Sequence, residues 1–405
     1  MLYYEKVYTY LKNDFKEAIP LKYWRGWVVA AVFAFFTWGI SEFAKTHEAL
    51  VDMVWPYITR SYQSYMAEWS AGAAACLWQV FAVLIVVLIV AAIVLMIVLR
   101  WNLIQVAGWV AAAASILFFV HTGIYGLNTY AGSIAADIRM PEEEYTLAEL
   151  EEAAVYYRDK ANELAPQASR TGGQVDFPEF ETLAEQAANG FENLVYEQYY
   201  SIFAGSTVPV KKLGWADMYT SMGITGFTFG ITGEAAVNPQ IPDLCLAFTM
   251  CHEMAHRMSI ATERDANFAA FLACRFNDDV NFRYSAYFMA YRYCYNSIVS
   301  VGAKDTAARV SAGVSDLLKK DMAQYDAFFQ AHRDEKATKI ADTANDTVIK
   351  ASGDESGIKS YGEVTDLLVS WHIQQVVIPS QTEEEQQFDP FDPSQVDLTG
   401  LPNVK

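Results

Sequence analysis

The stretch of this sequence with the clearest chemical content runs from residue 249 to 271 and reads TMCHEMAHRMSIATERDANFAAF. His252 and His256 are four residues apart, so on a helix both imidazoles project from one face, one turn apart. That spacing lets two ring nitrogens reach one Zn²⁺ at about 2.0–2.1 Å. Glu253 would stand beside the open coordination position, where a carboxylate can take a proton from water and pass it to a leaving amine. The HExxH pattern therefore predicts a zinc site that hydrolyses amides; the alternative is a solvent-facing helix with ordinary polar residues.

A catalytic zinc site needs a third protein ligand, and Glu263 is the candidate. On a continuous helix, Glu263 would lie about 10 Å beyond His256 along the axis, too far to share a metal. We therefore expect a turn near Ser259, after which Thr262 caps a new helix that begins at Glu263. Asn267, one turn later, could hydrogen-bond the far nitrogen of a ligand histidine. A plain capping carboxylate and a helix-surface amide are the respective alternatives for Glu263 and Asn267.

Three apolar segments precede the motif, at about residues 26–44, 76–99 and 103–127. At helical rise, each is long enough to cross a hydrocarbon layer of about 30 Å, the first one only if it extends towards residue 44. The first segment lacks the small-residue cleavage pattern of a secretory signal and is accompanied by tryptophans typical of membrane interfaces. We expect three transmembrane helices in a membrane domain of residues 1–127; buried core helices are the alternative.

The distribution of cations predicts the orientation of these helices. Lys/Arg residues gather before the first segment and in the turn between the second and third, whereas few lie on the other side. Positive residues favour the cytoplasmic side, so we expect a multi-pass plasma-membrane protein with a cytoplasmic N-terminus. Everything after residue 127 would then be extracytoplasmic. The residues on the expected inner side are Lys6, Lys12, Lys16, Lys22, Arg25 and Arg100, against Lys45, Arg60 and Arg139 outside.

Charge separates the two parts of the chain. Residues 1–127 carry 8 Lys/Arg against 7 Asp/Glu, whereas the remainder carries 21 against 41. A domain this acidic repels nucleic acid and anionic lipid headgroups, so neither is an expected partner. The five cysteines form no disulfide framework, and we expect small buried hydrophobic side chains rather than a zinc-thiolate site.

Beyond the membrane domain, the pattern is mainly helical. Thr146 can cap a first helix, and a second is expected over residues 179–203. The alternation in GFTFGIT then favours a strand or hairpin. Further helices are expected over residues 243–301, about 304–334 and about 361–375, within a domain of residues 128–378. The tail, residues 379–405, is acidic and of disordered type.

Several segments resemble the bacterial membrane family catalogued as domain of unknown function 3810, which is zincin-like. The resemblance rests on CHEMAHRMSIATERDANFAAFLAC, on the three apolar N-terminal segments, and on STVPVKK, GITGFTFGITGEAAVN, FRYSAYFMAY and SYGEVTDLLVSWH. In addition, ERDAN is similar to the ExxA(N/D) segment of several gluzincin peptidases. The resemblance implies a gluzincin-type fold, with Glu263 as ligand and Asn267 as its partner. One departure is Ser259, which stands where a glycine is expected at the turn.

In zinc peptidases an edge strand above the metal pairs with the extended backbone of the substrate. By that analogy the candidate substrate-binding residues are Phe227, Thr228, Phe229, Gly230, Ile231 and Thr232. A purely structural hairpin is the alternative for this segment.

Two residues of the FRYSAY segment are candidates for stabilising an oxyanion. Tyr284 or Arg283 could do so if the helix after the ligand helix returns over the metal. Core packing of Tyr284 and a surface charge at Arg283 are the alternatives. His372 is a further candidate for the site, with a structural role as the alternative. No role is assigned to the remaining histidines, His47, His121 and His332.

These observations predict a membrane-anchored zinc metallopeptidase that acts on a peptide or protein. The alternative is a non-catalytic membrane receptor or assembly factor that keeps a zincin fold. An intramembrane protease is disfavoured because RMSIATERDAN, which follows the motif, is too polar to lie in lipid.

Overall fold

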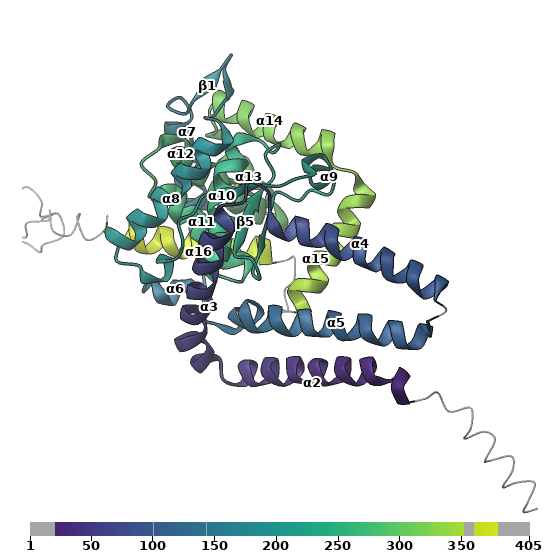
Figure 1. Ribbon diagram of the computed structural model, residues 1–405. Coiled ribbons are helices and arrows are strands. Elements are labelled where there is room, and N and C mark those ends of the chain that lie inside the picture. The colour runs from purple at the N-terminus through teal and green to yellow at the C-terminus, as the bar shows by residue number, and fades with distance from the viewer. Residues whose placement is uncertain (1–20, 100, 143, 352–359, 380–405) are drawn as a thin grey trace, which may run out of the picture.

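The computed structural model describes residues 21–99, 101–142, 144–351 and 360–379 (Figure 1). The protein is mainly helical with two small sheets, as the sequence predicts. The predicted acidic tail lies outside the described residues, apart from residue 379.

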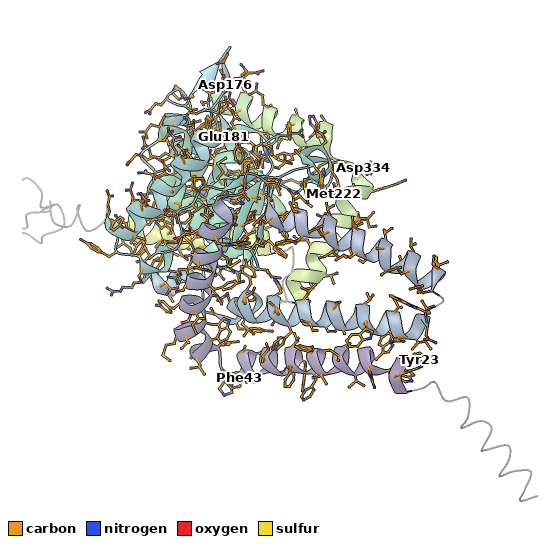
Figure 2. All side chains as sticks on the ribbon, viewed as in Figure 1. Tyr23, Phe43, Asp176, Glu181, Met222 and Asp334 are labelled. Carbon is orange, nitrogen blue, oxygen red and sulfur yellow. The ribbon has the colours of Figure 1, made fainter. Side chains whose placement is uncertain are left out.

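Three helices are long and apolar enough to cross a membrane, which confirms the expected spans. They are α2 (Arg25–Thr46), α4 (Leu77–Val98) and α5 (Leu103–Ile124). The third span ends before the predicted residue 127 because the chain tightens into the 3₁₀ turn η3 (Gly126–Tyr130). Figure 2 shows Tyr23 and Phe43, two aromatic side chains, near the opposite ends of α2.

Helices α2 and α5 pack closely along each other. Their backbones approach at Gly26 and Gly108, where a Cβ built on Gly26 would lie 2.4 Å from the Gly108 carbonyl carbon. Small residues at a membrane helix interface permit this approach. Helix α4 differs, since Gln79 in its first turn is its one buried residue among those described.

Helix α3 (Glu48–Ala71) lies between the first two spans, where the sequence analysis assigned no element. It runs across the ends of α2, α4 and α5 that face the rest of the protein (Figure 1). Its buried face carries Arg60 and Gln63, which donate to the carbonyl oxygens of Ser201 and Gly230 at 2.8 Å each. Helix α3 therefore joins the membrane spans to the region that contains the motif.

The region after the spans contains eleven α-helices among the described residues. Thr146 caps a helix, as predicted. Glu149 completes a capping box, because its carboxylate accepts a hydrogen bond from the Thr146 backbone amide. The single helix expected over residues 304–334 is two helices, because the chain turns at Gly313 and Ser315 caps the second. The helices are α6 (Ile134–Asp137), α7 (Leu147–Leu164), α8 (Phe180–Tyr196), α9 (Ala216–Ser221), α10 (Asp243–Arg257), α11 (Glu263–Arg275), α12 (Val280–Ser300), α13 (Lys304–Ala312), α14 (Asp316–His332), α15 (Glu335–Ala351) and α16 (Ser360–His372).

Two small sheets complete the fold. Strands β1 (Arg170–Thr171) and β2 (Gln174–Val175) form a short hairpin. Strands β3 (Lys211–Lys212), β4 (Gly226–Phe229) and β5 (Glu234–Val237) form a sheet in the order β3-β5-β4, with β4 antiparallel to β5. The strand and hairpin predicted from GFTFGIT are thus confirmed, and β4 is an edge strand that lies against α10.

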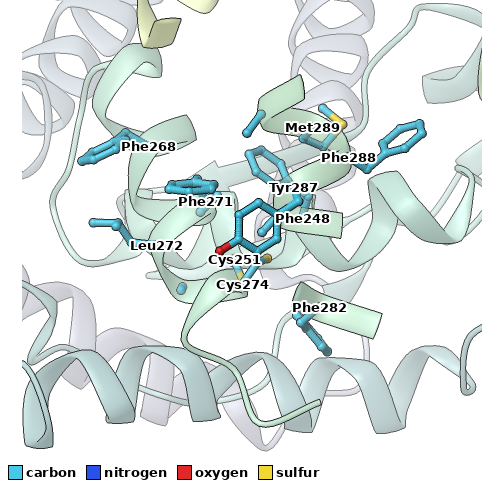
Figure 3. Close-up of a cluster of buried hydrophobic side chains, with 14 of the residues drawn as sticks. Phe248, Cys251, Phe268, Phe271, Leu272, Cys274, Phe282, Tyr287, Phe288 and Met289 are labelled. Atoms are coloured by element: carbon cyan, nitrogen blue, oxygen red, sulfur yellow. The ribbon is translucent and has the colours of Figure 1, made fainter. Parts of the chain in front are cut away.

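The hydrophobic core surrounds α10, which packs against α8, α11 and α12. Every residue of α10 after Asp243 is buried, so the motif helix is central rather than solvent-facing. Figure 3 shows aromatic side chains of α10, α11 and α12 filling this core beside Cys251 and Cys274. All five cysteines are free and buried, as expected.

The approach of α8 to α11 gives a first prediction. A Cβ built on Gly190 would lie 1.9 Å from the Ala273 carbonyl oxygen, so Gly190→Ala should force the helices apart and destabilise the protein by about 1–3 kcal/mol. Gly39→Ala in α2 is the control, because a Cβ there meets nothing within 4 Å and alanine favours a helix. Thermal unfolding in detergent measures both, and a Gly190→Ala melting temperature at or above the wild-type value would contradict this packing.

Candidate metal centre

Helix α10 presents the two histidines of the motif to one point. Both imidazoles are buried, and their Nε2 atoms lie 3.1 Å apart across one helical turn. The rings are nearly perpendicular, at 87°. Two ring nitrogens that face each other this closely need a proton or a cation between them.

The chain turns directly after α10, as the sequence predicts. Ser259 adopts the left-handed conformation, with φ of 71°, although it carries a side chain. Its hydroxyl accepts a 2.9 Å hydrogen bond from Thr59 of α3, and this contact supports the unusual backbone. Thr262 then caps α11 by accepting from the Asp265 amide at 3.2 Å, and Glu263 is the first residue of the new helix.

This turn brings Glu263 back to the histidine pair. Its Oε2 atom lies 3.2 Å from His252 Nε2 and 3.7 Å from His256 Nε2, and the ligand atoms of the three residues lie within 4.8 Å of one another. Ligand atoms around a tetrahedral zinc ion are about 3.3 Å apart when each bond is about 2.0 Å. The three residues therefore form a group that could hold a metal ion.

The electrostatics of the group also fit a cation. Burial alone would raise the pKa of Glu263, but the two histidines hold it well below its usual range. Burial would likewise lower the pKa of His256, yet the carboxylate of Glu263 outweighs it and raises that pKa to about 9. The site thus holds a carboxylate that recruits positive charge, either as a proton on His256 or as a metal ion in its place.

His256 is oriented from behind by two oxygens. Its Nδ1 lies 2.8 Å from the Ile260 carbonyl and 3.0 Å from the Tyr125 hydroxyl. Since a carbonyl can only accept, Nδ1 carries the hydrogen and Nε2 is left as the metal-binding atom. Tyr125 follows the last residue of α5, so a membrane span contributes to the site. Sequence reasoning missed it because 131 positions separate the two residues.

The expected bond from Asn267 to a ligand histidine is absent. The Asn267 Oδ1 atom instead accepts from the Tyr293 hydroxyl of α12 at 3.1 Å. The Nδ2 atom of Asn267 and the Nδ1 atom of His252 are both buried without a hydrogen-bond partner among the described residues. Asn267 is therefore buried beside the site, held by a tyrosine that the sequence analysis did not single out.

Glu253 points from α10 towards β4. The Thr228 hydroxyl donates to its Oε2 atom at 2.7 Å and to its carbonyl oxygen at 2.9 Å. A Cβ built on Gly226 would lie 2.4 Å from Glu253 Oε1, so a side chain there would displace the Glu253 carboxylate. Burial raises the pKa of Glu253, although both histidines oppose the rise.

The predicted substrate-binding segment divides into two parts. The Asn238 amide donates to the Thr225 carbonyl, and alternation along an antiparallel pair then directs the peptide groups of Gly226 and Thr228 to the open edge of β4. In contrast, Gly230 and Ile231 accept bonds through their carbonyls from Gln63 and Tyr62 of α3.

Thr232 belongs to this second part as well. It is buried, and its hydroxyl donates to Glu234 at 2.7 Å. Residues 230–232 thus attach the hairpin to the protein, and the open edge lies in residues 226–229.

The other candidate residues lie in structural contacts. The Tyr284 hydroxyl is buried and donates to Asp321 Oδ2 at 2.5 Å, where Asp321 is paired with Arg170. Arg283 donates to the carbonyls of Asn277 and Asp278. Neither side chain contacts the histidine pair among the described residues, so the expected oxyanion role is not supported for either.

His372 is also outside the metal-binding group. It is buried in a cluster of aromatic rings, with its ring centroid 5.0 Å from that of Tyr156. Burial lowers its pKa to about 4, which keeps the imidazole neutral.

Metal content tests the proposed ligands. His256→Ala should reduce bound metal in the purified full-length chain from one ion to well below one, because the two remaining ligands would hold a metal ion weakly. His332→Ala is the matched control, since that histidine is exposed at the end of α14. Elemental analysis of both proteins measures the ratio, and full metal retention in His256→Ala would rule out this ligand set.

The hydroxyl of Tyr125 should strengthen metal binding through His256. Tyr125→Phe should leave the site filled at saturation but weaken the affinity about tenfold, as expected when an outer hydrogen bond to a ligand is lost. Tyr157→Phe removes a comparable buried hydroxyl, bonded to the Leu368 carbonyl, and should leave the affinity unchanged. Competition with a chelating dye provides the dissociation constants; equal effects of the two substitutions would refute a specific role for Tyr125.

Comparison with known proteins assigns a family but no activity. No curated protein and no solved structure matches the chain. The sequence profile of one family, described as a protein of unknown function (DUF3810), matches residues 51–369, which extend from α3 to α16. The match begins within α3 and includes two of the spans, the sheet and the motif. The chain is therefore a member of the DUF3810 family.

Proposed function

We propose that this protein is a membrane-anchored zinc metallopeptidase. The observation that supports the proposal best is the convergence of His252, His256 and Glu263 on one point, with Glu253 buried on the same helix. Three protein ligands with room for a fourth is the arrangement of a catalytic rather than a structural zinc site. Bound there, zinc would supply Lewis-acid polarisation of a peptide carbonyl and lower the pKa of a water molecule.

In this proposal Glu253 moves the protons. Its carboxylate accepts a proton from the attacking water and donates it to the leaving nitrogen of the cleaved bond. The bond from Thr228 holds one carboxylate oxygen in place, and the raised pKa makes Glu253 a stronger base than an exposed glutamate. The absence of a side chain at Gly226 lets the other oxygen, Oε1, keep its position against β4.

Strand β4 would hold the substrate. The peptide groups of Gly226 and Thr228 face the open edge, and an extended peptide could add to the sheet there through main-chain hydrogen bonds. Both residues also flank Glu253, so a peptide bound along β4 lies next to the base.

We further propose that the site is extracytoplasmic and that the protein is a multi-pass protein of the plasma membrane. The support is the cation asymmetry, since Lys/Arg residues concentrate before α2 and at the turn between α4 and α5. The ends of the three spans that meet α3 then lie on the same side as the site.

Substitution of the base tests the catalytic proposal. Glu253→Gln should retain one zinc ion and reduce turnover by about 10³-fold, because the amide cannot accept the proton. Glu192→Gln, an exposed position on α8, is the control and should match wild type. The substrates are a randomised peptide library free in solution and the same library fused to a membrane span, with products identified by mass spectrometry.

Two outcomes would contradict the proposal. Wild-type turnover in Glu253→Gln would exclude this carboxylate as the base. A zinc-loaded wild-type protein that cuts neither library would favour the non-catalytic receptor instead.

A further inference from the structure

The metal group lies directly at the ends of two membrane spans. Tyr125, one residue after α5, touches His256 through its hydroxyl. On the opposite side of the hairpin, α4 begins at Leu77, whose amide donates to Glu234 of β5 at 2.7 Å. The site is therefore placed at the membrane boundary by the spans themselves and is not suspended on a linker above it.

The first turn of α4 is fixed to the sheet by a buried carboxylate. Glu234 accepts from the amides of Leu77 and Trp78, which is favourable because a helix N-terminus carries partial positive charge. Lys211 pairs with the same carboxylate at 2.7 Å. In addition, the Gln79 side chain exchanges two hydrogen bonds with the backbone of Gly214. The start of α4 and the sheet thus form one rigid unit.

Trp78 connects this span to the proposed substrate strand. Its ring centroid lies 5.0 Å from that of Phe227 and 6.0 Å from that of Phe229. Along β4 the side chains alternate, so Thr228 faces Glu253 while Phe227 and Phe229 face Trp78. Phe227 remains 42% exposed. A peptide added to the open edge would place every second side chain on this aromatic face.

Beyond its first turn, α4 is apolar and uncovered among the described residues. No residue of α4 after Gln79 is buried, whereas α2 and α5 pack against each other. Figure 1 shows α4 and α5 farthest apart where α4 leaves the sheet, and closer together where α4 ends and α5 begins. An apolar surface thus continues from Phe227 through Trp78 along α4 into the depth of the bilayer.

On this basis, and resting on the proposed peptidase function, we propose that the substrate is a polypeptide that itself spans the membrane. Its extracytoplasmic juxtamembrane segment binds as a strand along β4, with an apolar side chain against Phe227 and Trp78. Its own span continues beside α4. The continuity of the apolar surface from strand to span is what selects this occupant over a soluble peptide, which would leave the flank of α4 unused.

Terminal proteomics tests this substrate class in cells that produce either the wild-type chain or Glu253→Gln. Peptide termini that depend on Glu253 should lie within about ten residues of a membrane span, on its extracytoplasmic side. An extended chain advances about 3.3 Å per residue, so more distant bonds would be carried away from the site. Such sites should be at least tenfold enriched over sites in soluble exported proteins.

The two ways of failing are distinct. Glu253-dependent termini that fall mainly in soluble proteins, or far from any span, would overturn the substrate inference and leave the peptidase proposal standing. No Glu253-dependent termini at all would overturn the peptidase proposal, and the inference with it.

A matched pair of variants tests the aromatic surface in the same cells. Phe227→Ser should lower the yield of these termini about tenfold while the purified protein still binds one zinc ion, and Phe227→Leu should restore most of it. Tyr199→Ser makes a similar change at a side chain that is 85% exposed and outside β4, and it should have no effect. Unchanged cleavage in zinc-loaded Phe227→Ser would contradict docking on this surface.

Discussion

Two imidazole nitrogens and a carboxylate oxygen lie within 3.1–3.7 Å of one another, and contacts from several surrounding elements hold them there. Without a positive charge between them, the lone pairs of these atoms would repel each other in a buried setting. Their approach depends on the short turn at Ser259, which adopts a left-handed backbone that serine disfavours. The hydroxyl of Thr59 and the cap at Thr262 hold that turn from its two sides.

The membrane part of the chain therefore does more than anchor the site. Helix α3 crosses the ends of the spans and fixes the turn and the hairpin through Thr59 and Gln63. Helix α5 leads into Tyr125, whose hydroxyl contacts His256, and the first turn of α4 is held by the carboxylate of Glu234. Removal of the spans would expose the apolar faces of α3 and the sheet and remove these contacts, so the site and the membrane anchor form one structural unit.

Features encoded by near neighbours were accessible from the sequence. Eleven residues contain three predicted features that the structure confirms. They are the placement of His252 and His256 on one helix, the turn at Ser259 and the cap at Thr262. The three spans were accessible for the same reason, since length and apolarity are local properties.

Features that depend on distant contacts were not accessible. Tyr125 and Thr59 approach the motif from 131 and 200 positions away. The side-chain oxygen of Asn267 accepts a hydrogen bond from Tyr293, a residue of the next helix, and the spacing of the motif does not indicate this bond. The sequence analysis missed helix α3 because it looked for long apolar segments, whereas α3 has a polar face and an internal proline, Pro56.

X-ray absorption spectroscopy at the zinc edge, on the purified full-length protein, examines the central arrangement directly. The proposed zinc site would give a four-coordinate ion with two imidazole nitrogens at about 2.0–2.1 Å and two oxygen ligands, one of them from Glu263. In Glu263→Ala the spectrum should lose one protein oxygen and keep both imidazoles. A spectrum with thiolate sulfur, with one imidazole, or unchanged by Glu263→Ala would contradict the three-residue metal centre.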